Sequence, residues 1–256
     1  MCTVVISFAP GERVPVLVLG VRDEFTGRPW RPPARHWAGS ALLGGLDEQA
    51  GGTWLAVHPG VPRVSCLLNG RGVPADLAVR HSRGELPLRT AGEGAEVLKQ
   101  LSGDPAALAA YDPFHLVCAD LESVWLLSWD GEGVACTDLA PGTHVLTNAG
   151  HAYPAPTVTD PKAAYFGAKF AARRPSGDPA LPLEEAWGDW IALASGDGLQ
   201  ADDPRSIIAR RDLPDGRVWG STSLSLVALA GSGLRYDFQP VPGGTEGWYP
   251  VSQWRR

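Results

Sequence analysis

The sequence predicts an α+β fold, organised as a single domain over residues 1–256. Short runs of apolar and β-branched residues, typical of strands, occur in groups that alternate with longer segments of helical spacing. No low-complexity linker divides the chain, and no internal repeat is visible. The order of strands, helices, strands, helices and strands suits two sheets covered by helices, with one helical layer for each sheet.

The first two strands are expected at residues 3–8 and 14–19, joined by a turn over residues 9–12. The first run is rich in β-branched residues, and the second is continuously apolar, as in a strand covered on both faces. Antiparallel strands of similar length return the chain to its start, so Asp23 should lie beside Cys2. The alternative for Arg22, Asp23 and Glu24 is a solvated turn.

Residues 26–50 are rich in Gly, Pro and Arg and show no periodicity, which predicts a long loop. Loops of this length in compact domains are often functional. Trp30, His36 and Trp37 lie in it, either lining a pocket or pinning the loop to the core. Strands should follow at residues 53–58 and 63–68, and Asn69 then enters a turn.

The remaining segments alternate between helices and strands. Ser82 and Glu85 have the spacing of a capping box, and Pro87 should kink or delay the helix that follows. Asp160-Pro161 predicts another helix start. Helices are expected at residues 94–101, 104–111, 162–174 and 183–194, with one helical turn at 206–210; strands are expected at 114–119, 123–128, 134–137, 142–147, 220–230 and 234–238.

Composition and charge exclude several classes of protein. A hydrophobic content of 44% with 20% charged residues is globular, and a net charge of −6 without a basic patch argues against a nucleic-acid partner. The four cysteines lack C-x-x-C spacing, which favours reduced thiols over disulfides or zinc. No secretory signal is visible, and no apolar run approaches the ~20 residues of a membrane span. We therefore expect a cytoplasmic protein without a membrane partner.

Cys2 directly follows the initiator methionine. A small residue at this position favours removal of Met1, which would leave Cys2 with both a thiol and a free α-amine. An amine with an ordinary pKa of about 7.7–8.0 is able to take the thiol proton near neutrality, so Cys2 would hold a nucleophile and its base. The alternative is a small apolar residue that begins a buried strand.

Several short motifs follow one another in a fixed order from end to end of the chain. They are Met1-Cys-Thr-Val-Val5, Gly20-Val-Arg-Asp-Glu-Phe25, Arg28-Pro-Trp30, Gly44-Gly-Leu-Asp47, Gly51-Gly-Thr-Trp-Leu55, Leu68-Asn69, Ser82-Arg-Gly-Glu-Leu86, Pro141-Gly-Thr-His-Val-Leu-Thr-Asn148 and Ser221-Thr-Ser-Leu-Ser-Leu-Val227. In this order they resemble the NRDE family, also called the transport-and-Golgi-organisation-two family and named for an Asn-Arg-Asp-Glu tetrapeptide. Here Val21 replaces the first Asn of that tetrapeptide.

The resemblance implies a four-layer αββα sandwich of antiparallel sheets, as in N-terminal-nucleophile (Ntn) hydrolases. It implies that Cys2 attacks an amide or acyl carbonyl, while Asp23 holds the α-amine by a hydrogen bond. Asn69 and Asn148 would then donate to the oxyanion, and Arg22 would orient a carboxylate or acyl oxygen. Candidate substrate-binding residues are Trp30, His36 and Trp54. The expected partner is a small amide or acyl substrate, with no cofactor.

Three other interpretations remain open. An acyltransferase differs only in whether an amine or alcohol, instead of water, takes the acyl group. A non-catalytic haem- or ligand-binding or trafficking protein is the second, with His36, His144 and His151 as available ligands. The third is a folded protein in which Cys2 is inert. No histidine pair has the i, i+4 spacing of a helical ligand set, so no zinc site is expected.

Overall fold

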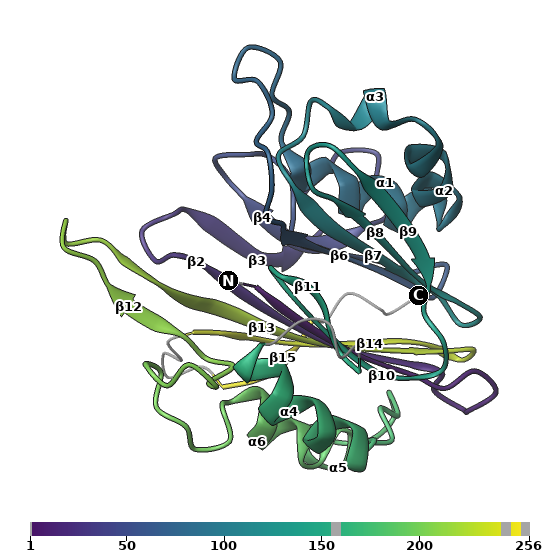
Figure 1. Cartoon of the computed structure of the whole chain (residues 1–256). Helices are drawn as coiled ribbons and strands as arrows, with labels where there is room; N and C mark the ends of the chain where they lie inside the picture. Colours follow the sequence, from purple (N-terminus) through teal and green to yellow (C-terminus); the bar gives the residue numbers. More distant parts are fainter. Residues whose placement is uncertain (1, 155–159, 242–246, 252–256) are drawn as a thin grey trace. The chain divides into compact units, whose positions relative to one another are not determined.

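The computed structural model describes residues 2–154, 160–241 and 247–251. The chain forms two compact units, one built from Met1–Arg28 and Pro141–Arg255 and the other from Pro29–Ala140. Each unit contains one antiparallel sheet and its own helices (Figure 1), so the predicted α+β class with two antiparallel sheets is confirmed. A single domain over residues 1–256 stays a prediction.

The first unit has a sheet in the order β11-β10-β1-β2-β13-β14-β15, with β12 paired to β13. In chain order its strands are β1 (Thr3–Phe8), β2 (Val16–Phe25), β10 (Gly142–Thr147), β11 (Gly150–Tyr153), β12 (Arg210–Asp212), β13 (Val218–Ala230), β14 (Gly233–Pro240) and β15 (Tyr249–Pro250). The β1–β2 hairpin pairs Thr3 with Val21, which returns the end of β2 to the start of β1. Because β1 pairs with β10 on its other side, the start of β1 lies inside the sheet and not at its edge.

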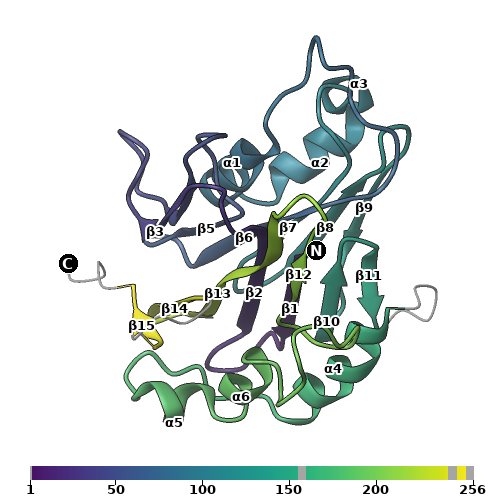
Figure 2. The same ribbon diagram turned by 90° about the vertical axis from the view of Figure 1, so that its left-hand side faces the viewer.

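Three helices cover one face of this sheet: α4 (Pro161–Ala172), α5 (Leu183–Trp187) and α6 (Trp190–Ala194) (Figure 2). They meet the sheet through fully buried aromatic side chains, which pack on aliphatic residues of β1, β2 and β13. These side chains are Phe166, Phe170, Trp187 and Trp190. The helical layer therefore holds one face of β1 and β2 in an apolar environment.

Local sequence signals explain where these helices begin and end. Asp160 accepts hydrogen bonds from the backbone N–H groups of Lys162 and Ala163, so the predicted Asp-Pro start of α4 is confirmed. The expected continuous helix over residues 183–194 is interrupted at Gly188, whose φ of 48° ends α5. The helical turn expected at residues 206–210 was wrong, because the backbone of Ala209 binds Ser221 and the chain enters β12.

The second unit is a meander in which neighbouring strands follow chain order from β3 to β9. Its strands are β3 (Trp30–Ala34), β4 (Leu43–Asp47), β5 (Leu55–His58), β6 (Arg63–Asn69), β7 (Phe114–Ala119), β8 (Val124–Trp129) and β9 (Val134–Asp138). The 3₁₀ turn η1 (Arg83–Glu85), α1 (Leu86–Glu93), α2 (Glu96–Gly103) and α3 (Pro105–Leu108) complete the unit. Leucines of α1 and α2 pack on Phe114, Leu116 and Trp129 of the sheet.

Two expectations for this unit need correction. Residues 26–50 do not form one long loop, because β3 and β4 lie within them. The edge strand β3 contains two prolines and a register shift, and β4 contains two glycines, so neither has the pattern of a strand. Ser82 accepts from the N–H of Gly84 and starts only the 3₁₀ turn η1, so the predicted capping box with Glu85 does not form. The α-helix α1 begins later, at Leu86, with Pro87 in its first turn, so the predicted delay of this helix is confirmed.

Candidate active site

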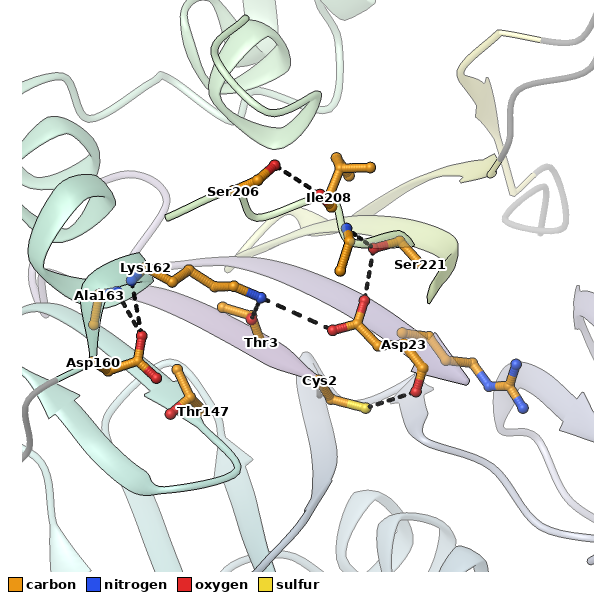
Figure 3. A network of polar contacts seen from close by, with 12 residues as sticks. Cys2, Thr3, Asp23, Thr147, Asp160, Lys162, Ala163, Ser206, Ile208 and Ser221 are labelled. Atoms are coloured by element: carbon orange, nitrogen blue, oxygen red, sulfur yellow. Dashed lines mark hydrogen bonds and ion pairs between the residues drawn. The ribbon is translucent and has the colours of Figure 1, made fainter. Parts of the chain in front are cut away.

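The hairpin brings Cys2 and Asp23 together, as the strand lengths predict (Figure 3). The thiol of Cys2 lies 3.7 Å from the backbone carbonyl oxygen of Asp23 and is placed to donate to it. Cys2 is partly exposed, whereas Asp23 is buried. The charged residues at the end of β2 are therefore part of the sheet, and the alternative of a solvated turn was wrong for Arg22 and Asp23.

The carboxyl group of Asp23 is held from two sides. Ser221 of β13 donates a hydrogen bond to Oδ1 at 2.7 Å, and Lys162 of α4 places its Nζ 3.9 Å from Oδ2. The same ammonium donates to Oγ1 of Thr3 at 3.1 Å. Burial raises the pKa of Asp23, and the nearby charge of Lys162 acts in the opposite direction. Figure 3 shows this network, which joins three strands and one helix.

Arg22 is held by an irregularity in the opposite strand. The register of β13 shifts between Ser221 and Ser223, which face Asp23 and Arg22, so Thr222 is an extra residue in a β-bulge. Thr222 Oγ1 accepts from the Arg22 guanidinium at 2.9 Å and donates to the Arg22 carbonyl at 3.2 Å. Successive residues of a strand point to opposite faces, so the side chains of Arg22 and Asp23 lie on opposite faces of β2. Each is held by a residue at the bulge of β13, Arg22 by Thr222 and Asp23 by Ser221.

The thiol of Cys2 is not activated by its surroundings alone. Burial raises the pKa of Cys2, the carboxylate of Asp23 raises it further, and Arg22 opposes both. A thiol with a raised pKa is protonated at neutral pH and is a poor nucleophile. Chemistry at Cys2 therefore requires a base close to the sulfur.

Asn148 belongs to the same unit and follows β10 directly. Its neighbour Thr147 pairs with Thr3, so Asn148 lies just beyond this pair, on the opposite side of β1 from Asp23. Its side-chain Oδ1 is buried and has no hydrogen-bond partner among the residues that the structure describes. Cys2, Arg22, Asp23 and Asn148 therefore come from three neighbouring strands or their ends.

Val21, which stands where the family tetrapeptide has Asn, lies on the helix-facing side of β2. It is 2% exposed and belongs to the apolar cluster formed with α4, α5 and α6. Its partners in the sheet are Thr3 on β1 and Leu224 on β13. Position 21 is thus on the same face as Asp23, two residues away.

The other predicted site residues belong to the second unit, so their position relative to Cys2 remains a prediction. Asn69 ends β6 and is exposed. Trp30 and Trp54 form an edge-to-face pair with ring centroids 5.9 Å apart, and Trp54 fills the space beside Gly45. His36 bonds through Nε2 to the backbone oxygen of Pro32 at 2.8 Å.

The remaining histidines and the cysteines are the other candidate metal ligands. His144 and His151 contact each other, with Nδ1 of His144 3.0 Å from Nε2 of His151. Burial lowers the pKa of His151, and the neighbouring His144 lowers it further. No group of three His, Cys, Asp or Glu that could hold a metal occurs in the described part of the chain. The cysteines are free thiols, as predicted, and burial raises the pKa of Cys118 to about 12.

Sequence reasoning missed Lys162, and it found Thr3, Ser221 and Thr222 only as members of motifs without a role. The available signal for Lys162 was its place in the first turn after Asp160-Pro161, although this does not show where its side chain ends.

None of the described helices is long and apolar enough to cross a membrane.

Comparisons with known proteins connect this site to a family. No curated protein matches the chain. Among solved structures, the Caenorhabditis elegans ortholog of N-acylethanolamine-hydrolyzing acid amidase is similar over 58% of this chain and 70% of that protein's chain, with 12% identity and a TM-score of 0.32. The family model described as Transport and Golgi organisation 2 matches residues 1–172, which include Cys2, Asp23 and Lys162. The chain therefore belongs to the Transport and Golgi organisation 2 family.

Proposed function

We propose that the protein is an amidohydrolase or acyl-transfer enzyme whose nucleophile is the thiol of Cys2. The observation that carries this proposal is the contact of Cys2 with Asp23, whose buried carboxyl group is held between Ser221 and Lys162. Buried charged groups arranged around a thiol are costly for stability and are typical of functional sites. The four-layer αββα arrangement implied by the NRDE resemblance belongs to the same proposal.

The proposed reaction begins after removal of Met1, which exposes the α-amine of Cys2. This amine takes the thiol proton, and the thiolate attacks the carbonyl carbon of a small amide or acyl substrate. Collapse of the tetrahedral intermediate breaks the bond to the leaving nitrogen, which receives the proton from the Cys2 ammonium. Water completes a hydrolysis, whereas an amine or alcohol completes an acyl transfer. The raised pKa of the Cys2 thiol supports the need for such a base.

Neighbouring residues have separate proposed roles. Asp23 accepts a hydrogen bond from the Cys2 amine and stabilises its protonated form. Asn148 and Asn69 donate to the oxyanion, a contribution of several kcal/mol where donors are preorganised. Arg22 orients a carboxylate or acyl oxygen of the substrate. Trp30, His36 and Trp54 contribute to substrate binding from the second unit.

Two measurements on protein purified from cells test the proposal. Intact mass should show that Met1 is absent, because a peptide nitrogen at Cys2 is not a base. Iodoacetamide labelling followed by peptide mapping should then modify Cys2 faster than the buried Cys66 and Cys118. Retention of Met1 on all molecules would exclude the amine as base, and a Cys2 no more reactive than the buried thiols would contradict the enzyme proposal.

Catalysis itself is tested with a panel of small amides and thioesters. Cys2→Ala should lose all turnover, and Cys2→Ser should keep at most a trace. These changes are small enough to cost about 1 kcal/mol or less of stability, so both variants should melt close to wild type. Equal turnover by wild type and Cys2→Ala would assign any activity to another site.

The second candidate function is non-catalytic binding of haem or another ligand. The observation in its favour is the close His144–His151 pair on β10 and β11. Haem titration of the purified protein should then give a saturable absorbance change at stoichiometric protein, lost in His144→Ala or His151→Ala, while His36→Ala tests the third histidine. A featureless titration favours the acyl-transfer proposal.

A further inference from the structure

Lys162 is buried beside the candidate nucleophile, although no step of the chemistry proposed above uses it. Its side chain is 7% exposed and extends from the first turn of α4 toward β1 and β2 (Figure 3). An ammonium group is costly to bury unless charged and polar partners compensate for its lost hydration. The partners of Lys162 are Thr3 and Asp23, the residue after Cys2 and the residue whose carbonyl contacts the Cys2 thiol.

We propose that Lys162 is a positioning residue that keeps Asp23 ionised and fixed at the start of β1. Its Nζ is 3.9 Å from Asp23 Oδ2 and 3.1 Å from Thr3 Oγ1, so one ammonium connects the two strands of the hairpin at Cys2. Ser221 holds the other carboxylate oxygen at 2.7 Å. The inference rests on the proposed function, because an ionised Asp23 matters to the chemistry only if its carboxylate holds the Cys2 amine.

The electrostatic reason is that a buried carboxyl group is neutral unless a positive charge compensates for its lost hydration. Burial raises the pKa of Asp23, and among the described residues Lys162 is the main opposing influence. A protonated Asp23 would stabilise an ammonium at the Cys2 nitrogen poorly. The amine would then be a weaker base. We expect this loss to outweigh the direct effect of the Asp23 carboxylate, which raises the pKa of the thiol, so that less of the Cys2 thiol ionises at neutral pH. Lys162 would thus act on Cys2 through Asp23.

Other charged groups around this point have different partners. Arg22 on β2 hydrogen-bonds to Thr222, on the bulge of β13. The carboxylate of Asp160 caps the first turn of α4. Farther along α4, Lys169 pairs with Asp197 beyond α6, and on β10 and β11 the histidines contact each other. Lys162 is the side chain of α4 whose ammonium lies against the Asp23 carboxylate.

The experiment measures the rate of Cys2 alkylation by iodoacetamide as a function of pH in wild type, Lys162→Met, Asp23→Asn and the double variant. Lys162→Met should react roughly tenfold more slowly near pH 7, with its profile moved to higher pH, as expected when an ionisable group loses one close opposite charge. If Lys162 acts through Asp23, Lys162→Met should have no further effect once Asp23 is replaced, so the double variant should react as slowly as Asp23→Asn alone.

A matched control removes another lysine ion pair from the same helix. Lys169 lies on α4 and forms an exposed ion pair with Asp197. Lys169→Met breaks this pair and should leave the alkylation profile unchanged. Lys162→Arg keeps the positive charge and should stay close to wild type. Should Lys162→Met fail to fold, the arginine variant still tests the idea, because a profile like that of Asp23→Asn would overturn it.

The results distinguish this inference from the function on which it rests. Rapid alkylation of wild-type Cys2 together with a wild-type profile in folded Lys162→Met would overturn the role of Lys162 alone. Additive effects in the double variant would also overturn it, since Lys162 would then act on the thiol independently of Asp23. A wild-type Cys2 as slow as Cys66 would overturn both proposals.

Discussion

Ser221 donates a hydrogen bond to Oδ1 of Asp23 across 2.7 Å, although the two residues are 198 positions apart in the chain. The same hydroxyl accepts from the backbone N–H of Ala209 at 2.9 Å. Ser221 is thus fixed by the segment before β12, and in turn it fixes the Asp23 carboxyl group. This relationship links the C-terminal strands to the N-terminal cysteine, which only the folded sheet brings together.

Replacing Ser221 by Ala should therefore affect both stability and the reactivity of Cys2. The variant loses two hydrogen bonds of a buried hydroxyl, which we expect to cost about 1–3 kcal/mol of unfolding free energy. It should also slow alkylation of Cys2, because Asp23 is no longer held on its Oδ1 side. Ser225→Ala is the control, because Ser225 lies on the same strand as Ser221. It removes a buried contact with Tyr236 of β14 and should lower stability without slowing alkylation. Equal alkylation of both variants and wild type would contradict a role for Ser221 at the site.

Asn148 offers a prediction in which stability and activity change in different directions. Its buried Oδ1 has no partner in the described structure, and a polar atom of this kind usually costs stability. Asn148→Ala should therefore be as stable as wild type or more stable. Loss of an oxyanion donor should at the same time lower kcat by about 10²–10³-fold on any substrate that the panel identifies. Parallel measurements of melting temperature and turnover test this, and unchanged turnover would remove Asn148 from the mechanism.

The histidine pair predicts a pH dependence of stability. Burial and the neighbouring His144 lower the pKa of His151 in the folded state. A lowered pKa means that the unfolded chain binds more protons as the pH falls below the ordinary value of about 6.5, so stability is present above this pH and lost below it. Melting temperature should fall more between about pH 7.5 and about pH 5.5 for wild type than for His151→Gln. Equal losses in both proteins would mean that other groups cause the change.

The first strand pair and its consequence were predictable because they depend on local pattern. The apolar run of β1 and a short turn are enough to bring Asp23 to Cys2. Lys162 and Ser221 were not assigned, because their side chains reach the site only after α4 packs on the sheet and β13 pairs with β2. The bulge at Thr222 depends on the register between two distant strands, which no local pattern specifies.

Val21 gives the last prediction, because it is the point at which this chain departs from its family's tetrapeptide. Val21→Asn would place an amide in an apolar cluster, on the same face as Asp23 and opposite Thr3. We expect a loss of about 1–3 kcal/mol of unfolding free energy, since the amide is buried with few partners. The matched control is Leu19→Asn, which buries an amide on the same face of β2, two residues farther from the site. Both variants should be destabilised, as measured by denaturant unfolding. Only Val21→Asn should alter the pH profile of Cys2 alkylation, because only at position 21 is the amide placed to compete with Thr3 and Asp23 for the ammonium group of Lys162. Identical profiles for the two variants would show that position 21 influences stability alone, and that the replacement of Asn by Val has no effect on the ionisation of Cys2.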